Sequence, residues 1–290
     1  MASERSRSRA VLITGCSTGI GRATAERLGR RGWTVYASAR NLDSIQNLTA
    51  AGCKVLALDV TSEPSRRAAV EAVEAAEGVV GVLVNNAGFG LHGAAEEADL
   101  DVVRQQFETN FFGLARMTQL VLPGMRRQRW GKLVNVSSMG GKLSFPGGAF
   151  YHASKHAVEA FSDVLRFEVT PFGIDVIVIE PGTVQSKYAD TALATIEDSR
   201  SESSKTGPYD SFNASLAETI HGAYTGPLGR FAISPEHVAR AIERAISAKK
   251  SRTRYVVPAP IRGLLVLRKV LPDRAFDTLL KSSYRPPTPS

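Results

Sequence analysis

The chain has 290 residues, of which 43% are hydrophobic, and carries a formal net charge of +8. This length and apolar content suit one sizeable globular core, and near-average glycine and proline usage excludes collagen-like and broadly disordered chains. Cys16 and Cys53, the only cysteines, are too few for a disulfide framework and lack the spacing of metal ligands. We therefore predict no metal site and a reducing compartment, the cytoplasm.

The positive charge gathers in the first ten residues, at 126–129 and in the stretch 249–269. These clusters lack the regularly interleaved aromatic side chains on which bases stack, so no nucleic-acid partner is predicted. Residues 1–8 form a basic tail without the apolar stretch of a secretory signal, and we expect this tail to be disordered.

Between residues 10 and 183, short apolar runs alternate with segments of helical period. The runs occupy residues 10–14, 34–38, 54–58, 81–85, 132–136 and 174–179. Such runs suit strands buried on both faces, and strands that alternate with helices form a parallel sheet covered on both sides. The sequence predicts an α/β fold, a doubly wound parallel sheet of the Rossmann type, in one domain over 9–257.

A glycine-rich loop, TGCSTGIG, follows the first run and opens the first helical segment. Gly15, Gly19 and Gly21 allow a sharp turn and a close approach of the backbone to a pyrophosphate, which the helix N-terminus attracts. A structural turn without a ligand is the simpler alternative, but the position between strand and helix is the context that a dinucleotide site requires.

The end of the second run indicates which dinucleotide binds. An acidic residue here would bind a ribose 2′-hydroxyl and repel a 2′-phosphate, but the sequence reads YASARN. Arg40 offers a cation for the phosphate, so NADP is favoured over NAD; a solvated arginine at a strand end is the alternative.

Tyr151 and Lys155, in YHASK, lie in a segment of helical period that runs from 148 to 170. They share one helix face, one turn apart, an arrangement that also arises by chance as a surface tyrosine over a lysine stem. A nearby cation lowers the pKa of a phenol toward the neutral range in which a proton shuttle works. Ser138, thirteen residues earlier, ends the fifth run at the ligand-binding edge of such sheets, with Ser137 as its competitor.

The pattern changes after residue 186. Residues 187–232 are rich in serine, glycine and threonine without strong periodicity, and we expect a substrate lid or a disordered loop. A helix resumes at SPEHVARAIERAI, and a last strand, RYVVP, follows. Residues 258–290 form an apolar and basic extension whose uncharged runs are too short to span a bilayer. We expect its helical part to pack on the body or cover the cleft; a membrane surface is a less favoured partner.

These motifs resemble those of the short-chain dehydrogenase/reductase family, and most of all its hydroxysteroid and retinol dehydrogenase branch. The loop from Thr14 to Gly21 matches the family's Thr-Gly-x-x-x-Gly-x-Gly at every fixed position, and the resemblance covers about residues 9–257. DV at 59–60, NNAG at 85–88 and PGTVQS at 181–186 resemble further family motifs, with Ser186 where a threonine is usual. The resemblance implies a cofactor site formed by Gly15, Ser17, Thr18, Gly19, Ile20, Gly21, Arg40, Asp59, Val60, Asn86, Ala87, Gly88, Tyr151, Lys155, Pro181, Gly182 and Val184.

The same resemblance implies a catalytic set of Asn110, Ser138, Tyr151 and Lys155. Tyr151 would exchange a proton with the substrate oxygen, which Ser138 would orient, so these two residues also form the substrate site. Lys155 would tune Tyr151 and bind the nicotinamide ribose, while Asn110 would hold a water that links the lysine to solvent. The implied reaction is hydride transfer between nicotinamide and a carbonyl or carbinol carbon.

Apolar residues near these motifs predict a small-molecule partner, a bulky hydrophobic alcohol or ketone such as a steroid, retinoid or lipid. They are Phe89, Leu91, Met139, Leu143, Phe145, Pro146 and Val184. No metal-ligand pattern links the five histidines, interpreted as structural or solvated: His92, His152, His156, His221 and His237. The alternatives are a catalytically idle NADP-binding scaffold and a peripheral membrane protein. The resemblance also implies a homodimer or homotetramer built on the helix that carries Tyr151.

Overall fold

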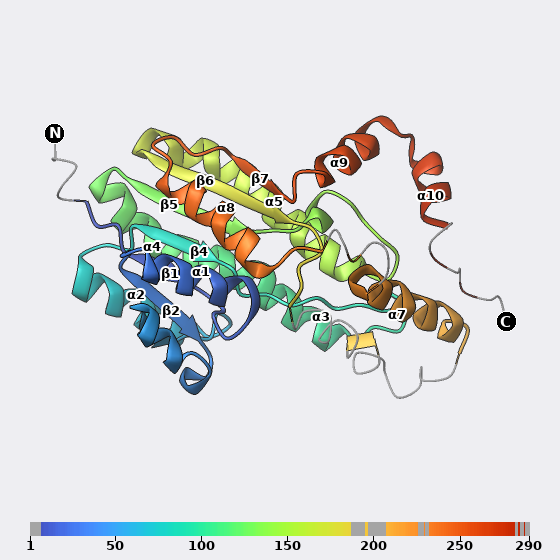
Figure 1. Cartoon of the computed structure of the whole chain (residues 1–290), viewed down its shortest axis with the longest axis horizontal. Helices are drawn as coiled ribbons and strands as arrows, with labels where there is room; N and C mark the ends of the chain where they lie inside the picture. The colour runs from blue at the N-terminus through green and yellow to red at the C-terminus, as the bar shows by residue number, and fades with distance from the viewer. Residues whose placement is uncertain are drawn as a thin grey trace.

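Seven parallel strands form the centre of the computed structural model (Figure 1). The structure describes residues 7–186, 195–196, 207–225, 229, 232–281, 284 and 287. The strands are β1 (Val11–Ile13), β2 (Val35–Ala39), β3 (Lys54–Ala57), β4 (Val82–Asn85), β5 (Gly131–Val136), β6 (Ile174–Pro181) and β7 (Arg254–Val257). They lie in the order β3-β2-β1-β4-β5-β6-β7, which confirms the predicted doubly wound sheet.

The winding of the sheet reverses beside β1. Val11 pairs with Val35 of β2 on one side and with Val82 of β4 on the other. Successive strands run outward from this point in both directions, so the loops that follow β1 and β4 separate and leave a crevice at the carboxyl ends of the strands. The glycine-rich loop therefore lies where open α/β sheets bind ligands.

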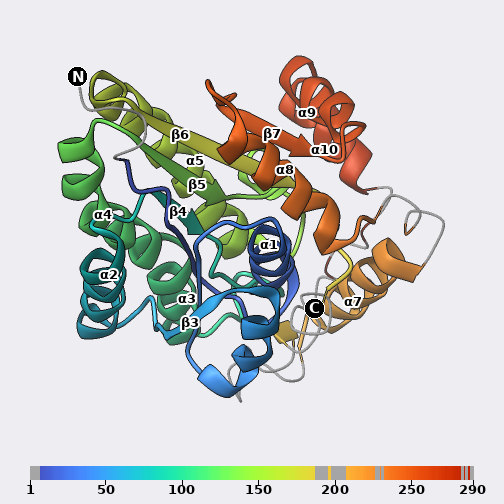
Figure 2. The ribbon, with the colours of Figure 1, turned by 60° about the vertical axis from the view of Figure 1, so that its left-hand side comes forward.

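Helices cover both faces of the sheet, because each apolar strand offers side chains to both sides (Figures 1 and 2). One layer consists of α1 (Gly19–Arg30) and α8 (Pro235–Ser247). The other consists of α2 (Glu63–Glu77), α4 (Leu114–Gln128) and α5 (Ala149–Val169). Leu28 in the first layer and Met117 in the second are fully buried, so the core continues through the sheet.

Shorter elements join these layers. They are α3 (Leu100–Phe107), the 3₁₀ turns η2 (Leu42–Ser44), η3 (Gln46–Ala51), η5 (Met139–Gly141) and η6 (Thr170–Phe172), and the π-helical turn η4 (Glu108–Gly113). Two of them, η4 and η5, contain or directly follow predicted site residues, Asn110 and Ser138.

Helix α7 (Asp210–Thr225) lies inside the segment predicted as a lid or loop, and here the structure differs from the prediction. The helix is rich in serine, alanine and threonine, and its large apolar side chains form only one narrow row, Phe212, Leu216, Ile220 and Tyr224, so the helical pattern in the sequence is weak. Polar contacts anchor it instead: Asn213 accepts a hydrogen bond from the Ala94 N–H at 3.1 Å and donates one to Glu97 at 2.7 Å. The rest of the predicted lid, at 187–194, 197–206, 226–228 and 230–231, lies outside the described residues.

The C-terminal extension forms two helices, α9 (Ile261–Val270) and α10 (Asp273–Lys281), where the sequence indicated one helical stretch. Pro272 lies between them. A proline cannot continue a helix, so α9 ends before it and α10 begins after it. Both helices lie beyond the edge strand β7 (Figure 1). Val270 is 73% exposed and Phe276 is the buried residue of α10, so packing on the body is less extensive than expected. Within the described residues, no helix is long and apolar enough to cross a membrane.

Candidate active site

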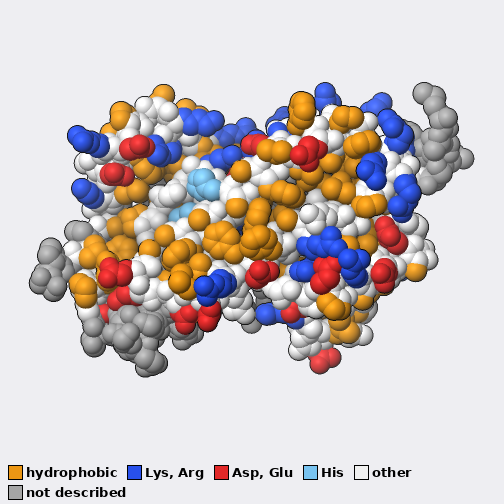
Figure 3. Space-filling model, turned by 180° about the vertical axis from the view of Figure 1, so that it is seen from behind, with side chains coloured by type: hydrophobic (Ala, Val, Ile, Leu, Met, Phe, Trp, Pro, Cys, Tyr) orange, Lys and Arg blue, Asp and Glu red, His pale blue; other side chains and the backbone are white. Residues whose placement is uncertain are grey.

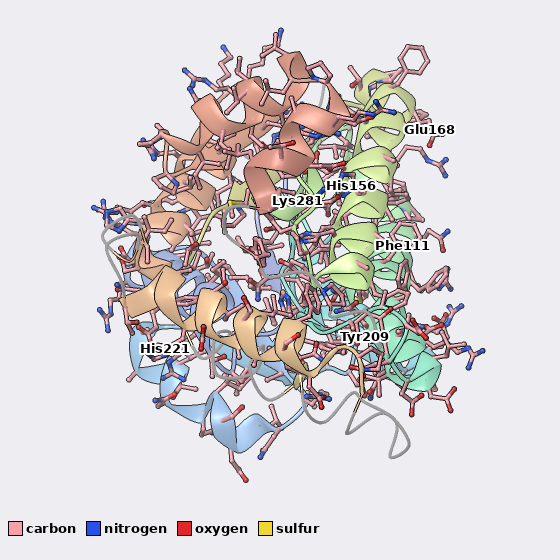
Figure 4. All side chains as sticks on the ribbon, turned by 90° about the vertical axis from the view of Figure 1, so that its right-hand side faces the viewer. Phe111, His156, Glu168, Tyr209, His221 and Lys281 are labelled. Carbon is pink, nitrogen blue, oxygen red and sulfur yellow. The ribbon has the colours of Figure 1, made fainter. Side chains whose placement is uncertain are left out.

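A cleft with a volume of about 750 Å³ opens at the carboxyl ends of the strands, bordered by the glycine-rich loop and by α7. Figure 4 looks toward this end of the molecule, with α7 and the labelled His221 in front. Every predicted cofactor residue except Gly21 lines the cleft, and so does Ser138. Asn110 does not border it. Residues that are distant in the sequence therefore meet in one cavity.

The three glycines of the loop act differently. Gly15 has φ +72°, and a Cβ there would lie 2.9 Å from the Cα of Ala87. A Cβ on Gly21 would lie 2.4 Å from the Gly15 carbonyl oxygen, so α1 packs closely on the loop and Gly21 faces away from the cleft. Gly19 has φ +60°, lines the cleft, and would bring a Cβ no closer than 3.6 Å to another residue. Gly15 and Gly21 thus serve packing, while Gly19 leaves room for a ligand.

The first residues of α1 line the cleft. Thr18 precedes the helix with an extended backbone, and no side chain caps the helix N-terminus. The first turn also contains no acidic residue. The N–H groups that a helix leaves unpaired at this end, together with the helix dipole, therefore suit an anionic group such as a pyrophosphate.

Asn86 joins the end of β4 to the glycine-rich loop. Its side-chain amide donates hydrogen bonds to the carbonyls of Thr14 at 2.9 Å and Gly15 at 3.0 Å. The Thr14 hydroxyl oxygen in turn accepts from the N–H groups of Asn86 and Ala87, each at 3.0 Å. These bonds hold the NNAG segment against the loop, so the two sides of the crevice keep a defined separation.

Arg40 and Asp59 line the cleft where β2 and β3 end. Burial acts to raise the pKa of Asp59, but the N–H and hydroxyl of Thr61 and the charge of Arg40 hold this pKa below its usual value. Arg40 itself is exposed, so its guanidinium is accessible to a ligand. This end of the cleft can neutralise an anionic group.

Tyr151 and Lys155 lie one turn apart on α5, and both line the cleft. The Lys155 ammonium lies 6.0 Å from the centre of the Tyr151 ring and donates a 2.9 Å hydrogen bond to the Val136 carbonyl. Burial of the lysine lowers its pKa to about 8, against the opposing effect of the Glu159 charge. A half-buried phenol therefore stands near a desolvated cation, an arrangement that can support proton transfer.

Ser138 lies two residues after the end of β5 and caps the turn η5. Its hydroxyl oxygen accepts a 3.0 Å hydrogen bond from the Gly140 N–H, which leaves the hydroxyl proton for another acceptor. Ser137 also borders the cleft but is only 3% exposed, whereas Ser138 is half-buried. The more accessible hydroxyl of the two is that of Ser138.

Asn110 lies in the π-helical turn η4, a local widening of a helix that is frequent at functional sites. Its oxygen accepts from the Phe89 N–H at 3.0 Å, and its amide group donates to the Phe89 carbonyl at 2.9 Å and to Ser154 at 3.1 Å. Asn110 is 1% exposed. Its side chain therefore ties the cleft wall at Phe89 to α5 instead of reaching into the cleft.

Apolar side chains form much of the remaining cleft wall. Of the residues predicted to face the substrate, those that line the cleft are Phe89, Met139, Phe145, Pro146 and Val184. The prediction is wrong for Leu91 and Leu143, which are 3% and 1% exposed and do not border the cleft. A position near a motif does not show which way a loop side chain points, and these two point into the protein.

Comparison with known proteins identifies the family. A family model described as short chain dehydrogenase matches residues 9–197, a span that includes the glycine-rich loop, Ser138, Tyr151 and Lys155. The chain belongs to the short-chain dehydrogenase family. It is an oxidoreductase of that family.

Relatives of this short-chain dehydrogenase match it over nearly its whole length. The 3-ketodihydrosphingosine reductase of Bacteroides thetaiotaomicron is 35% identical and covers 94% of this chain and 97% of its own. The 17-beta-hydroxysteroid dehydrogenase type 6 of Rattus norvegicus is 33% identical and covers 96% of this chain and 89% of its own. A solved short-chain dehydrogenase/reductase from Burkholderia phymatum, in complex with NAD, has a TM-score of 0.77 and 27% identity, covering 98% of this chain and 97% of that one.

Sequence reasoning missed the part of the short-chain dehydrogenase cleft that α7 and the C-terminal segment form. Leu216, Ile220 and Tyr224 of α7 line the cleft, as does Tyr284. Burial raises the pKa of Tyr224 to about 12, with a further contribution from Tyr151 nearby. Leu216, Ile220 and Tyr224 are spaced four residues apart, which is a weak helical signal in the sequence, but only the fold shows that this face of α7 borders the cleft.

Two histidines interpreted as structural or solvated also border the cleft. They are His92 and His152, with ring centres 5.7 Å and 5.5 Å from that of Tyr151. Burial lowers the pKa of each imidazole to about 4, so both are neutral near pH 7. Across the described parts of the chain, no group of three or more metal-binding side chains occurs.

Proposed function

We propose that this short-chain dehydrogenase is an NADPH-dependent reductase of the carbonyl group of a bulky hydrophobic substrate, a steroid, retinoid or lipid-like ketone or aldehyde. The observation that carries the proposal is the position of Tyr151 near buried Lys155, in a cleft with an extensive apolar wall. Such a tyrosine can exchange a proton with a substrate oxygen, and an apolar wall favours an apolar ligand. Oxidation of the corresponding alcohol would use the same groups.

The residues of the cleft fit NADP. The glycine-rich loop and the N-terminus of α1 would hold the pyrophosphate, Arg40 the 2′-phosphate, and Asp59 and Val60 the adenine. Segments 86–88 and 181–184 would border the nicotinamide. When bound, NADPH supplies the hydride that reaches the carbonyl carbon. A similar protein was solved with NAD, and what supports NADP here is Arg40 in place of an acidic residue.

The chain's own groups would act on the substrate oxygen. Tyr151 would donate its phenolic proton to this oxygen, and Ser138 would hold the oxygen by a hydrogen bond. The Lys155 ammonium would stabilise the phenolate left on Tyr151 and bind the nicotinamide ribose. Asn110 would act indirectly, because its hydrogen bonds to the Phe89 backbone hold the cleft wall in place.

The names of the relatives support an apolar substrate. One is named as a reductase of a sphingoid ketone and another as a steroid dehydrogenase, and both ligands are large and mainly apolar. The cleft has aromatic and aliphatic side chains on several sides, including Phe89, Phe145, Leu216 and Tyr224. Burial of an apolar ligand against such a wall is favourable because it removes apolar surface from water.

Oxidation of NADPH, followed by its absorbance, tests this proposal. The probes are androstenedione, all-trans-retinal and 3-ketodihydrosphingosine, with acetoacetate as a small polar control and NADH in parallel. We expect turnover of at least one apolar probe and faster turnover with NADPH. Faster turnover with NADH would overturn the cofactor assignment, and preference for acetoacetate would overturn the substrate class. Binding of NADPH without turnover of any probe would favour an idle scaffold.

We also propose a homodimer or homotetramer built on α4 and α5. Figure 3 shows the face opposite that of Figure 1, where hydrophobic side chains gather. Phe167 and Val164 of α5 are 87% and 62% exposed, and Phe112, just before α4, is 51% exposed. Covering these side chains would remove apolar surface from water. Light scattering should therefore report an oligomer for the wild type and a monomer for Phe167→Glu.

A further inference from the structure

His152 follows Tyr151 in α5, but its side chain lies under the loop that carries Ser138. The residue is 6% exposed. A Cβ on Gly140 would lie 2.5 Å from its Nδ1, and a Cβ on Gly148 would lie 2.5 Å from its Nε2. Both separations are too short for real atoms, so the imidazole fills a slot that exists because these two residues are glycines.

Gly140 links this imidazole to Ser138 through its two backbone groups. The Gly140 carbonyl oxygen lies 3.1 Å from His152 Nδ1, and the Gly140 N–H donates to the Ser138 hydroxyl oxygen at 3.0 Å. Because a carbonyl oxygen can only accept, Nδ1 of His152 carries the proton. The Ser138 oxygen is held on one side by an N–H and keeps its own proton for a different acceptor.

The surroundings keep the imidazole neutral and fixed in position. Burial lowers the pKa of His152 to about 4, although its hydrogen bond to Gly140 opposes this shift and His156 adds to it. The rings of Tyr151 and Phe145 stand 5.5 Å and 5.8 Å away and restrict its movement on two sides. A neutral imidazole with one fixed tautomer is a rigid hydrogen-bond donor and not an acid or a base.

We infer that His152 is a positioning residue, which holds Gly140 so that the Ser138 hydroxyl is oriented toward the substrate oxygen. The inference rests on the proposed function, because it assigns His152 a role only through Ser138. Loss of the Nδ1–H donor would free the turn η5 and let the hydroxyl move, and small displacements of reacting groups slow catalysis strongly. A histidine that served packing alone would affect the enzyme equally with and without the Ser138 hydroxyl.

A double-mutant cycle separates these two roles. It combines His152→Leu with Ser138→Ala and measures kcat with NADPH and the fastest of the three apolar probes. We expect His152→Leu to lower kcat on the order of 10- to 100-fold with little change in KM for NADPH. In the Ser138→Ala background it should change kcat by no more than about twofold. His152→Asn, which retains a side-chain N–H donor, should recover part of the activity.

The outcomes of the cycle are distinguishable. If the fold-losses of kcat in the two single variants multiply in the double variant, the inference is wrong and the proposed function stands. Wild-type turnover in Ser138→Ala would instead overturn the proposed role of Ser138.

Hydrogen exchange of the Gly140 amide gives a second readout that needs no substrate. We expect this amide to be protected in the wild type and to exchange about tenfold faster or more in His152→Leu. His237→Leu is the matched control, since His237 is an exposed histidine on α8 that does not border the cleft, and this substitution should leave exchange and kcat unchanged. Unchanged Gly140 exchange in a folded His152→Leu protein would contradict the inference.

Discussion

The ammonium of Lys155 donates a 2.9 Å hydrogen bond to the carbonyl of Val136, the last residue of β5. This bond fixes the lysine where α5 meets the carboxyl end of the sheet, and Val136 precedes Ser138 by two residues. The same position removes the ammonium from water, which lowers the pKa of Lys155 to about 8. Burial therefore makes the Lys155 ammonium lose its proton more readily than an exposed lysine does.

Because Lys155 is buried, we expect the free energy of unfolding to depend on pH in the alkaline range. Between pH 8 and 10.5 the unfolded chain keeps a proton on Lys155 that the folded chain loses, so the stability of the wild type should rise with pH relative to Lys155→Met. The full pKa shift corresponds to about 3 kcal/mol. Urea unfolding of both cofactor-free proteins at several pH values measures the difference. A difference that does not vary with pH would contradict the desolvated lysine.

Replacement of Tyr151 by phenylalanine removes the hydroxyl and keeps the ring. If Tyr151 donates the proton, kcat should fall by about 10²- to 10⁴-fold. The ring still lines the cleft, so the Kd for NADPH should change little. Steady-state kinetics and NADPH fluorescence titration measure the two quantities. Tyr255→Phe, on the edge strand β7, is the matched control and should keep wild-type kcat; equal activity in Tyr151→Phe would sink the assignment.

The strands and the cleft lining beside the glycine-rich loop were predictable because local patterns determine them. Six apolar runs indicated where six of the strands lie along the chain, and the position of Arg40 at a strand end follows from counting residues along β2. Tyr151 and Lys155 were predictable for the same reason, since four residues make about one helical turn. These features need no knowledge of contacts between distant segments.

The cleft lining beside α7 was less predictable because it depends on tertiary contacts. α7 is held by Asn213 and its hydrogen bonds to residues more than 100 positions away, and no local pattern shows this. Leu91 and Leu143 have the same chemical character as the true lining residues but point into the core. His152 looked like an ordinary helix residue, and its contact with Gly140 emerges only when η5 packs against α5.

Arg40 is expected to determine the preference for NADP. In Arg40→Ala the 2′-phosphate loses a charge-assisted hydrogen bond, so KM for NADPH should rise roughly 10- to 100-fold while KM for NADH stays unchanged. Kinetics with both cofactors at a fixed concentration of one carbonyl probe measure this. Arg104→Ala removes an exposed arginine of α3 that does not line the cleft and should leave both values unchanged. Equal rises in KM for both cofactors would contradict a 2′-phosphate contact.

Glu159 and Glu180 form a buried acidic pair behind Lys155, at 3% and 1% exposure. Arg254 makes ion pairs with both, at 3.0 Å to Glu159 and 3.1 Å to Glu180. Burial, followed by the charge of Glu159, raises the pKa of Glu180 to about 7. The folded chain therefore keeps a proton on Glu180 that the unfolded chain loses above about pH 4.5, and stability should fall as the pH rises toward 7.

Glu180→Gln removes this titration, because an amide remains neutral at every pH of the experiment. The Tm of the wild type should fall relative to that of Glu180→Gln between pH 5 and pH 8, by roughly 2 to 4 °C for each kcal/mol of linked free energy. Glu71→Gln, on the exposed side of α2, is the control and should run parallel to the wild type. If the Tm of Glu180→Gln also varies with pH in parallel with that of the wild type, Glu180 is ionised in the folded protein. The effect of Arg254 on the pKa of Glu180 would then outweigh those of burial and of Glu159.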